Sequence, residues 1–186
     1  MLIPGGVGMF FSVLMAAAAA GGSGPVTCEA VFIGPAAECS LEGQWAATGT
    51  ASGESKAKKR ASARLTEATE LALQARSLQS AGTLAAVIAE QQRVICPTEV
   101  AQHARISCFA SPELIGTQTC FADLPVEDCP DVPVVILEGV GFKAMEKSRK
   151  QLCQDVDDAL ETSEFSAAEQ LSCRSRCLVE SRVRCR

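Results

Sequence analysis

The cysteines constrain what this chain can fold into more than any other feature of the sequence. Ten of the 186 residues are cysteines, an even number, and all of them follow residue 27. They are Cys28, Cys39, Cys96, Cys108, Cys120, Cys129, Cys153, Cys173, Cys177 and Cys185. Scattered cysteines in an even number are typical of a disulfide framework formed in an oxidising compartment. The sequence therefore predicts up to five disulfide bonds from these ten residues.

Metal binding and reduced core cysteines are the alternatives for these residues. Zinc and iron-sulfur sites use closely paired cysteines, or cysteine with histidine at ligand spacing. Here the closest pair is Cys173-x-x-x-Cys177, and the single histidine, His103, has no ligand-spaced partner. We therefore expect disulfides, with no metal site and no cofactor.

Residues 1–24 have the features of a secretory signal peptide. Apart from Ser12, Val7 to Ala20 is a run of apolar residues and glycine that ends in alanines, and no charged side chain precedes Glu29. Such a run is typical of a cleaved export signal. A retained anchor is the alternative, but the run is shorter than the roughly 20 residues that span a bilayer. We expect a secreted or periplasmic protein with no membrane span after signal cleavage.

A β-hairpin is expected at the start of the mature chain. Val26 to Ile33 has a strand-like composition, Gly34-Pro35 is a turn signal, and Glu38 to Thr50 resumes an extended pattern. This hairpin would bring Cys28 and Cys39 to nearly facing positions. The sequence therefore predicts a bridge between these two cysteines, closing a short loop.

A long helix is expected from Glu54 onward. One face of it is small and apolar, with residues at helical spacing: Ala61, Leu65, Ala68, Ala72 and Ala75. Side chains of this size allow a helix to approach a sheet closely, so we expect this helix to lie across the hairpin.

Two features of this first unit are candidates for binding. Trp45, the only tryptophan, either caps the local core or serves as an exposed binding residue. Lys56, Lys58, Lys59 and Arg60 crowd the first turns of the helix, where cations oppose the helix dipole. This cluster is either a solvated face or a binding patch, and we take it as the candidate binding patch.

The second half of the chain resembles the first, which predicts a degenerate internal repeat. Cys108 and Cys120 are spaced much like Cys28 and Cys39, and a Leu-Glu-Gly sequence precedes the helix in both halves. The second helix is expected from Phe142 to Leu160. The predicted organisation is a signal peptide at 1–24, strand-helix units at 25–95 and 96–162, and a C-terminal helix at 163–186.

The C-terminal helix is expected to be stapled to the core. Ser166 and Glu169 are spaced as a capping box at its start. The helix would carry Cys173, Cys177 and Cys185 on one side. Cysteines one turn apart in a helix rarely bond each other, so we expect them to bond different segments. Cys153, on the preceding helix, is placed to bond a strand beneath it. The expected fold class is α+β and disulfide-rich.

Sequence motifs for catalysis are missing from the chain. It has no Gly-x-Ser-x-Gly elbow, no Walker-type Gly-Lys-Ser/Thr and no dinucleotide-binding glycine fingerprint. His103 has no nucleophile or carboxylate beside it in the sequence, so we expect a structural role for it. Two acidic groups lack the spacing of a calcium loop and predict a solvated patch: Glu127, Asp128 and Asp131, and Asp155, Asp157 and Asp158. We do not expect an enzyme.

The passage from residue 34 to residue 65 resembles the last strand and following helix of double-stranded RNA-binding domains. Members of that family have Gly-x-Gly, then Ser-Lys-Lys, then an alanine-rich second helix, and this chain has Gly49-Thr50-Ala51-Ser52-Gly53-Glu54-Ser55-Lys56 before its helix. The resemblance places Lys56 and Arg60 at two of the phosphate-contacting positions and Gly34-Pro35 near the minor-groove loop. Ala57 replaces one lysine of the motif, and no helix precedes the strands. The shared feature is therefore strands followed by a helix packed on one sheet face.

Taken together, these patterns predict an exported, disulfide-stabilised structural or binding protein of the cell envelope or extracellular space. A protein partner or an envelope component is the expected partner. The net charge of −5 disfavours a polyanion partner, because nucleic-acid-binding proteins usually carry a basic surplus. A double-stranded RNA-binding module is the first alternative, and a small secreted enzyme or inhibitor is the second.

Overall fold

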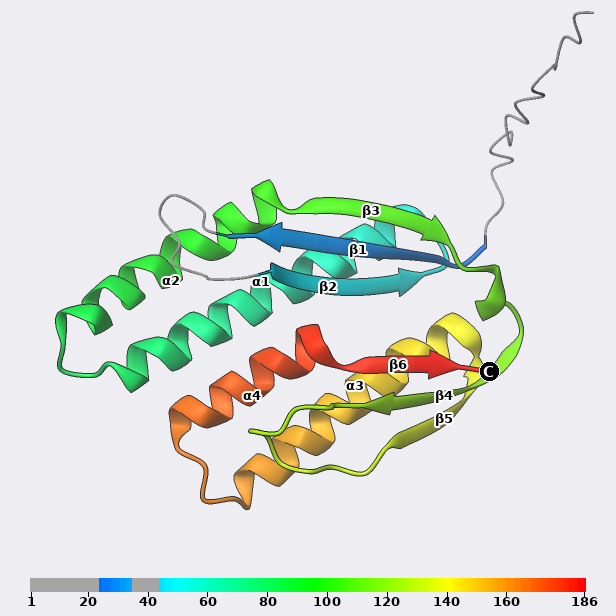
Figure 1. Ribbon diagram of the computed structural model, residues 1–186. Coiled ribbons are helices and arrows are strands. Elements are labelled where there is room, and N and C mark those ends of the chain that lie inside the picture. The colour runs from blue at the N-terminus through cyan, green and yellow to red at the C-terminus, as the bar shows by residue number, and fades with distance from the viewer. Residues whose placement is uncertain (1–23, 35–43) are drawn as a thin grey trace, which may run out of the picture.

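The protein is described by a computed structural model that covers residues 24–34 and 44–186. These residues form two three-stranded antiparallel sheets and four α-helices, and the helices lie together on one side of the sheets (Figure 1). The predicted α+β, disulfide-rich fold class is confirmed.

The first sheet contains the predicted hairpin. Strands β1 (Val26–Ile33) and β2 (Gln44–Ala51) pair antiparallel, and β3 (Arg105–Ala110) joins the other side of β1, which gives the order β2-β1-β3. Between β2 and β3 the chain forms α1 (Glu54–Gln79) and α2 (Leu84–His103). The expected long helix from Glu54 is confirmed.

The second sheet has the order β5-β4-β6. It is built from β4 (Thr117–Asp123), β5 (Val135–Val140) and β6 (Arg182–Cys185). Between β5 and β6 the chain forms α3 (Gly141–Glu161) and α4 (Ala167–Glu180). A short 3₁₀ turn, η1 (Pro112–Leu114), links the two sheets and buries Leu114.

Two predicted boundaries are wrong. The boundary between units predicted after residue 95 falls inside α2, which continues through Pro97 to His103, because Cys96 and Val100 are both fully buried on either side of Pro97 and this packing holds the helix together. The C-terminal helix ends at Glu180, and the next residues form β6. Their exposure alternates with the period of two that is typical of a strand.

Four disulfide bonds join described residues. The pairs are Cys28–Cys108, Cys120–Cys185, Cys129–Cys173 and Cys153–Cys177. Cys96 is also disulfide-bonded, and no cysteine is free within 24–34 and 44–186. Cys39 lies outside the described residues. As predicted, Cys173 and Cys177 bond different segments.

The predicted bridge between Cys28 and Cys39 is wrong. The pairing of β1 with β3 places Cys28 directly opposite Cys108, with their Cα atoms 4.1 Å apart, whereas Gly49 faces Cys28 from β2. Cys153 also bonds differently from the prediction. Its partner is Cys177 on α4 and not a strand residue, because α3 and α4 pack side by side.

The predicted internal repeat is not confirmed. Its alignment matched Cys28 with Cys108, and these two cysteines lie on adjacent strands of the same sheet and bond each other. The order of elements does recur. Each half of the chain forms two strands, then two helices, then the third strand of its sheet. In both sheets the first of these strands is central. β3 belongs to the first sheet, although it falls inside the predicted unit at 96–162.

A close approach of α1 to β2 depends on Gly49. The helix buries a face of small residues against the first sheet, including Ala57, Ala61 and Leu65. A Cβ atom at Gly49 would lie 2.5 Å from the backbone nitrogen of Ala61 and 2.6 Å from the carbonyl oxygen of Ala57. Neither backbone atom can move away without displacing the helix, so only glycine fits at this position.

The predicted capping box at the start of α4 is confirmed. The hydroxyl of Ser166 accepts a hydrogen bond from the backbone N–H of Glu169, and the Glu169 carboxylate accepts one from the backbone N–H of Ser166 at 2.8 Å. The hydrogen bonds from the Ser166 hydroxyl and backbone lower the pKa of Glu169 below its usual value of 4.5.

We expect Gly49→Ala to lower the free energy of unfolding by about 1–3 kcal/mol, because the added methyl group overpacks the α1–β2 contact. Thermal or urea unfolding measures the effect. The control is Gly139→Ala on β5, where the nearest atom to the new Cβ is the Ala144 Cβ at 3.8 Å, an ordinary contact. Equal losses in the two variants would contradict the close approach inferred for Gly49.

The charge of Glu169 should stabilise α4 only where the carboxylate is ionised. Because its folded-state pKa is lowered, its contribution is present above pH 4.5 and is lost as the pH falls through the folded-state value. Glu169→Gln keeps the hydrogen-bonding shape without the charge. Its melting temperature should lie below that of the wild type at neutral pH and meet it in acid, while exposed Glu164→Gln should show no such convergence.

Candidate anion-binding pocket

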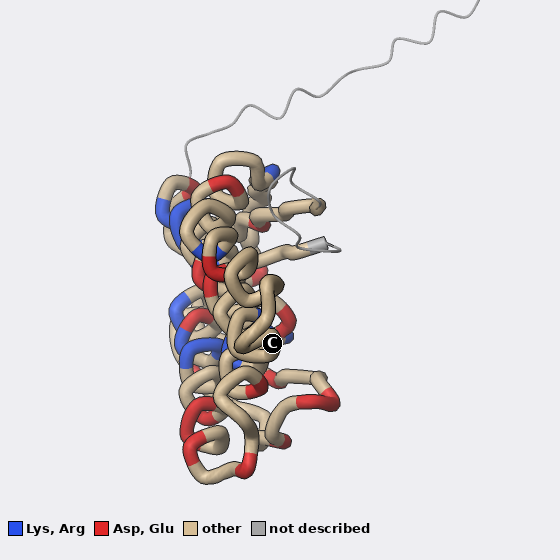
Figure 2. The backbone as a smooth tube through the Cα atoms, turned by 90° about the vertical axis from the view of Figure 1, so that its left-hand side faces the viewer, with Lys and Arg blue, Asp and Glu red and all other residues tan. Residues whose placement is uncertain are grey.

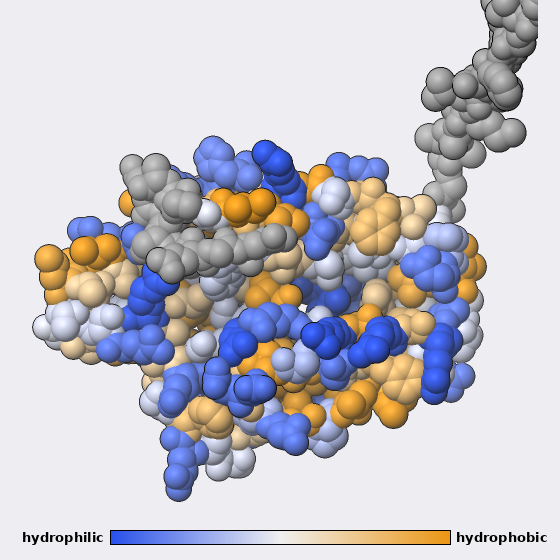
Figure 3. All heavy atoms as spheres, in the orientation of Figure 1, coloured by the Kyte–Doolittle hydropathy of each residue, from blue (hydrophilic) through white to orange (hydrophobic). Residues whose placement is uncertain are grey.

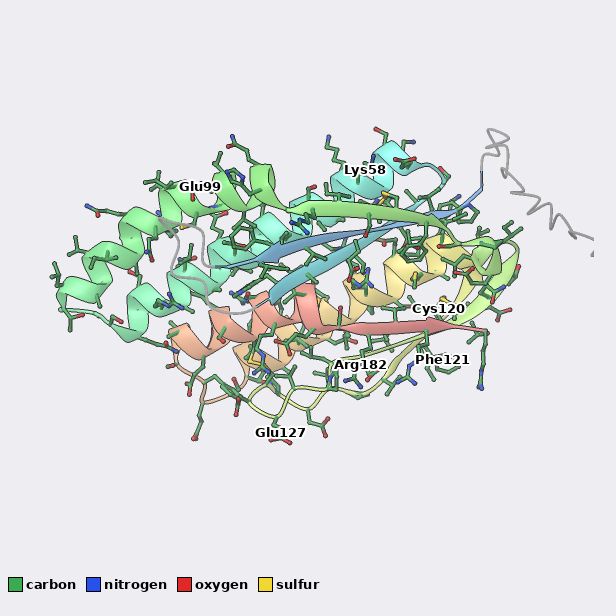
Figure 4. All side chains as sticks on the ribbon, turned by 45° about the horizontal axis from the view of Figure 1, so that its top comes forward. Lys58, Glu99, Cys120, Phe121, Glu127 and Arg182 are labelled. Carbon is green, nitrogen blue, oxygen red and sulfur yellow. A yellow bond between two sulfur atoms is a disulfide. The ribbon has the colours of Figure 1, made fainter. Side chains whose placement is uncertain are left out.

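The predicted basic cluster at the start of α1 divides into residues with different surroundings. Lys58 forms an ion pair with Glu54 at 2.6 Å, and Figure 4 shows it at the outer edge of the molecule. Lys59 is exposed. Lys56 and Arg60, one turn apart, line a pocket between α1 and α3. Only part of the predicted patch therefore belongs to one site.

The pocket has a volume of about 360 Å³ and lies between the first turns of two helices. Its lining consists of Ala51, Ser52, Lys56, Arg60, Phe142, Lys143, Glu146 and Lys147. Four of these eight side chains are cationic and one is anionic. In a chain with a net charge of −5, this is a local concentration of positive charge.

Both helices at the pocket begin at residues that cannot cap them. α1 follows Gly53 and α3 follows Val140, and neither residue has a side chain that could accept a hydrogen bond from the first-turn N–H groups. The positive end of each helix dipole therefore adds to the charge of the lysine and arginine side chains.

Four lining residues were not predicted as site residues from the sequence, namely Phe142, Lys143, Glu146 and Lys147. The Lys143 ammonium lies 5.9 Å from the centre of the Phe142 ring, so an aromatic surface adjoins the charges. The available signal was a pair of cations four residues apart at the start of each helix, Lys56 with Arg60 and Lys143 with Lys147. Only the tertiary structure brings these two pairs to the same pocket.

Glu146, which lines the pocket with Arg60, belongs to a cluster of ionic side chains. The Glu146 carboxylate is paired with Arg60, Arg64 and Arg149, at 3.9 Å for Arg60 and 3.6 Å for Arg149, with Arg64 in closer contact. The Glu146 and Arg149 side chains are only 13% and 7% exposed. Neither residue was predicted as a site residue from the sequence.

The ionic cluster also binds the backbone of β2, the edge strand of the first sheet. Glu146 accepts a hydrogen bond from the Thr50 N–H at 2.9 Å. Arg60 donates to the Thr50 carbonyl, and Arg149 donates to the Thr48 carbonyl at 3.5 Å. Side chains from α1 and α3 therefore satisfy backbone groups on the edge of β2.

Burial makes the charge of Arg149 costly. Desolvation, together with the nearby charge of Arg64, lowers the pKa of the Arg149 guanidinium to about 10, and the negative charge of Glu146 opposes this shift. Arg149 is still cationic at neutral pH. It therefore depends on Glu146 for compensation of its buried charge.

A second hollow, of about 560 Å³, lies where β2, α1 and α4 meet. Its lining includes Trp45, Arg76, Ser175 and Arg176. Trp45 is half-buried and also packs against the first core. It therefore contributes both to the core and to a concave surface.

The remaining sequence candidates lie away from the pocket. Figure 4 shows Glu127 at the edge of the molecule opposite to Lys58, and Figure 2 shows mainly acidic segments at the bottom of the end view. Asp155 accepts a hydrogen bond from Gln151, and Asp157 pairs with Arg174 at 2.9 Å. His103 is exposed in the last turn of α2.

In residues 24–34 and 44–186, no group of three or more His, Cys, Asp and Glu side chains is placed to hold a metal ion. Within the same ranges, no helix combines the length and the hydrophobicity that crossing a bilayer requires.

Comparison of the chain with protein-family models, with curated proteins and with solved structures finds no match. The function must therefore be argued from the geometry of the chain itself.

We expect Glu146→Gln to destabilise the protein by about 3–5 kcal/mol, because it leaves buried Arg149 beside Arg64 with no negative charge to compensate it. Chemical denaturation at neutral pH measures the loss. Glu138→Gln, at an exposed position on β5, removes the same charge as a control and should have little effect. A loss no larger than that of the control would show that Glu146 does not hold the cluster together.

Proposed function

We propose that this protein is an exported, non-enzymatic binding protein of the cell envelope or extracellular space, and that its basic pocket holds a small multivalent anion. The observation that carries this proposal is the convergence of Lys56, Arg60, Lys143 and Lys147 on one pocket in an acidic chain. These cations come from two helices that are far apart in the sequence.

Export is supported by the disulfide bonds. Four bonds link described residues, and such bonds persist in oxidising compartments and are rare in the cytosol. The sequence of residues 1–24, with its apolar run and terminal alanines, supports a cleaved signal peptide. A secreted or periplasmic location follows from these two features together.

A binding role is supported by the kind of groups at the pocket. Its cations supply charge and hydrogen-bond donors, and its one carboxylate, Glu146, is already engaged by arginines and the Thr50 N–H. The residues that line the pocket do not include a histidine or cysteine that could pair with Ser52 as a base or nucleophile. These features favour holding an anion over transforming one.

The chemistry of the lining indicates the class of ligand. Lysine ammonium groups on two helices favour an anion with several negative charges, such as an oligophosphate or a sulfated sugar. The ring of Phe142 offers an apolar surface next to Lys143. A volume of about 360 Å³ suits a small molecule or the end of an acidic polymer.

We further infer that the two units are an internal repeat, with a different alignment from the one that the cysteine spacing suggested. Buried positions recur every four residues in both long helices: Ala57, Ala61, Leu65, Thr69 and Leu73 in α1, and Ala144, Ser148, Leu152, Val156 and Leu160 in α3. Lys56 and Lys143 each precede the first of these positions, and Arg60 and Lys147 each precede the second. The pocket would thus be formed by equivalent residues of the two units.

Duplex RNA is the second candidate ligand. The resemblance of residues 34–65 to double-stranded RNA-binding domains puts Lys56 and Arg60 at phosphate-contacting positions, and both side chains line the pocket. Phosphate contacts would make such binding strongly dependent on salt. Substitution of Lys56 and Lys143 therefore tests both ligands.

Calorimetric titration with tripolyphosphate and with a sulfated disaccharide, at low and moderate salt, tests the proposal. We expect Lys56→Gln with Lys143→Gln to weaken binding by about 10-fold or more, because two charge-assisted contacts are lost. Lys58→Gln with Lys59→Gln removes the same number of charges from exposed positions of α1 and should leave affinity nearly unchanged.

Equal losses in the two double variants would show general attraction to the protein surface, and no binding at low salt would overturn the pocket as an anion site. A gel-shift titration measures the affinity for duplex RNA. The RNA-binding alternative would be favoured by an affinity that is higher than for either small anion, falls steeply with salt and is lost in the Lys56→Gln, Lys143→Gln double variant.

A further inference from the structure

The outward face of α2 is unusually apolar for an exposed surface. Five large hydrophobic side chains on it are exposed: Leu84 75%, Val87 55%, Ile88 47%, Val94 70% and Ile95 44%. Figure 3 shows hydrophobic residues along the upper left of the molecule, where Figure 1 places α2. A shallow apolar depression follows the same face over Ala86, Val87 and Val94. Contiguous patches of this kind on soluble proteins mark interaction surfaces.

The spacing of these residues is that of a helix-packing seam. Leu84, Val87 and Ile88 are followed seven residues later by Gln91, Val94 and Ile95. A repeat of seven residues with apolar positions three and four apart is the pattern by which one helix packs along another. The face therefore fits a second helix better than a small ligand.

The other half of the chain shows the kind of contact that α2 lacks. α4 occupies the corresponding place in the second unit, before the last strand, and it packs on both α1 and α3. α2 packs mainly on α1. Its buried residues Ala89, Cys96 and Val100 face that helix, which leaves the opposite side for a partner.

We propose that the outward face of α2 binds the same face of a second copy of this chain, giving a two-fold symmetric dimer with antiparallel α2 helices. This proposal is independent of the anion pocket. Pairing centred on Gln91 places Val87 opposite Ile95 and Ile88 opposite Val94, so these four apolar positions meet apolar positions of the partner, while Gln91 meets its own copy and Leu84 faces Thr98. A symmetric contact of this kind closes on itself and covers the apolar face of α2.

Charge favours pairing of α2 with the α2 of a second copy over packing of α2 on the α3 flank of that copy. Between residues 84 and 98 the only charged residues are Glu90 and Arg93, which have opposite signs and already pair at 2.8 Å. Two α2 helices can therefore meet without repulsion between like charges. The exposed flank of α3 instead carries Gln151, Gln154 and Asp158, which are polar and do not match an apolar face.

The area is sufficient for a dimer. From their exposed fractions, the five apolar side chains offer on the order of 500 Å² per copy, or about 1,000 Å² in total, which reaches the lower range of specific interfaces. We therefore expect a dimer that dissociates on dilution.

Sedimentation velocity of the disulfide-intact chain over a wide concentration range tests the proposal. We expect a monomer–dimer equilibrium that Val94→Glu weakens by about 100-fold or more, because the carboxylate would have to be buried against apolar side chains. Ile136→Glu is the matched control, since Ile136 is a 58% exposed hydrophobic residue on β5, far from α2 in the sequence, and it should dimerise like the wild type.

Cross-linking tests the antiparallel arrangement. Gln91→Cys should form an intermolecular disulfide readily, because the two copies of residue 91 meet at the symmetry axis. Leu84→Cys should not, because its two copies would lie about 21 Å apart along the helices. A monomer at every concentration, a dimer unaffected by Val94→Glu, or cross-linking through residue 84 but not residue 91 would each overturn the proposal.

Discussion

The contact between Glu146 and its arginines holds the two halves of the molecule in register. Glu146 and Arg149 come from α3, Arg60 and Arg64 come from α1, and the backbone that they bind belongs to β2. An edge strand presents unpaired N–H and C=O groups that must find partners. Here these groups bind charged side chains, so the edge of the first sheet is tied to the second unit by ionic contacts.

This contact explains why the basic pocket lies where it does. Three arginines pair with Glu146, and of these Arg60 lines the pocket together with the exposed Lys56, Lys143 and Lys147. Each unit contributes a helix start with two cations, and the ion pairs of Glu146 on α3 with Arg60 and Arg64 on α1 join the two starts. The ion pairs that join the two units therefore lie next to the cations of the candidate ligand site.

Local patterns predicted the elements better than their connections. The hairpin, the helix from Glu54 and the capping box at Ser166 were predicted because each depends on neighbouring residues and on period or capping chemistry. The continuation of α2 past Pro97 and the strand β6 were missed, because burial of Cys96 and pairing of β6 with β4 override local signals. Two of the four cations that line the candidate pocket, Lys56 and Arg60, were predicted as binding residues.

The sequence by itself determined that this is a disulfide-stabilised α+β protein, since cysteine number and residue periodicity are properties of the chain alone. The partners of Cys28 and Cys120 were decided by strand register, which places Cys108 opposite Cys28 and Cys185 opposite Cys120, and the partner of Cys153 was decided by the packing of α3 against α4. The pocket was likewise decided by tertiary structure. Lys56 and Lys143 share no local pattern that reports their proximity, and only the packing of α1 and α3 around Glu146 brings their charges together.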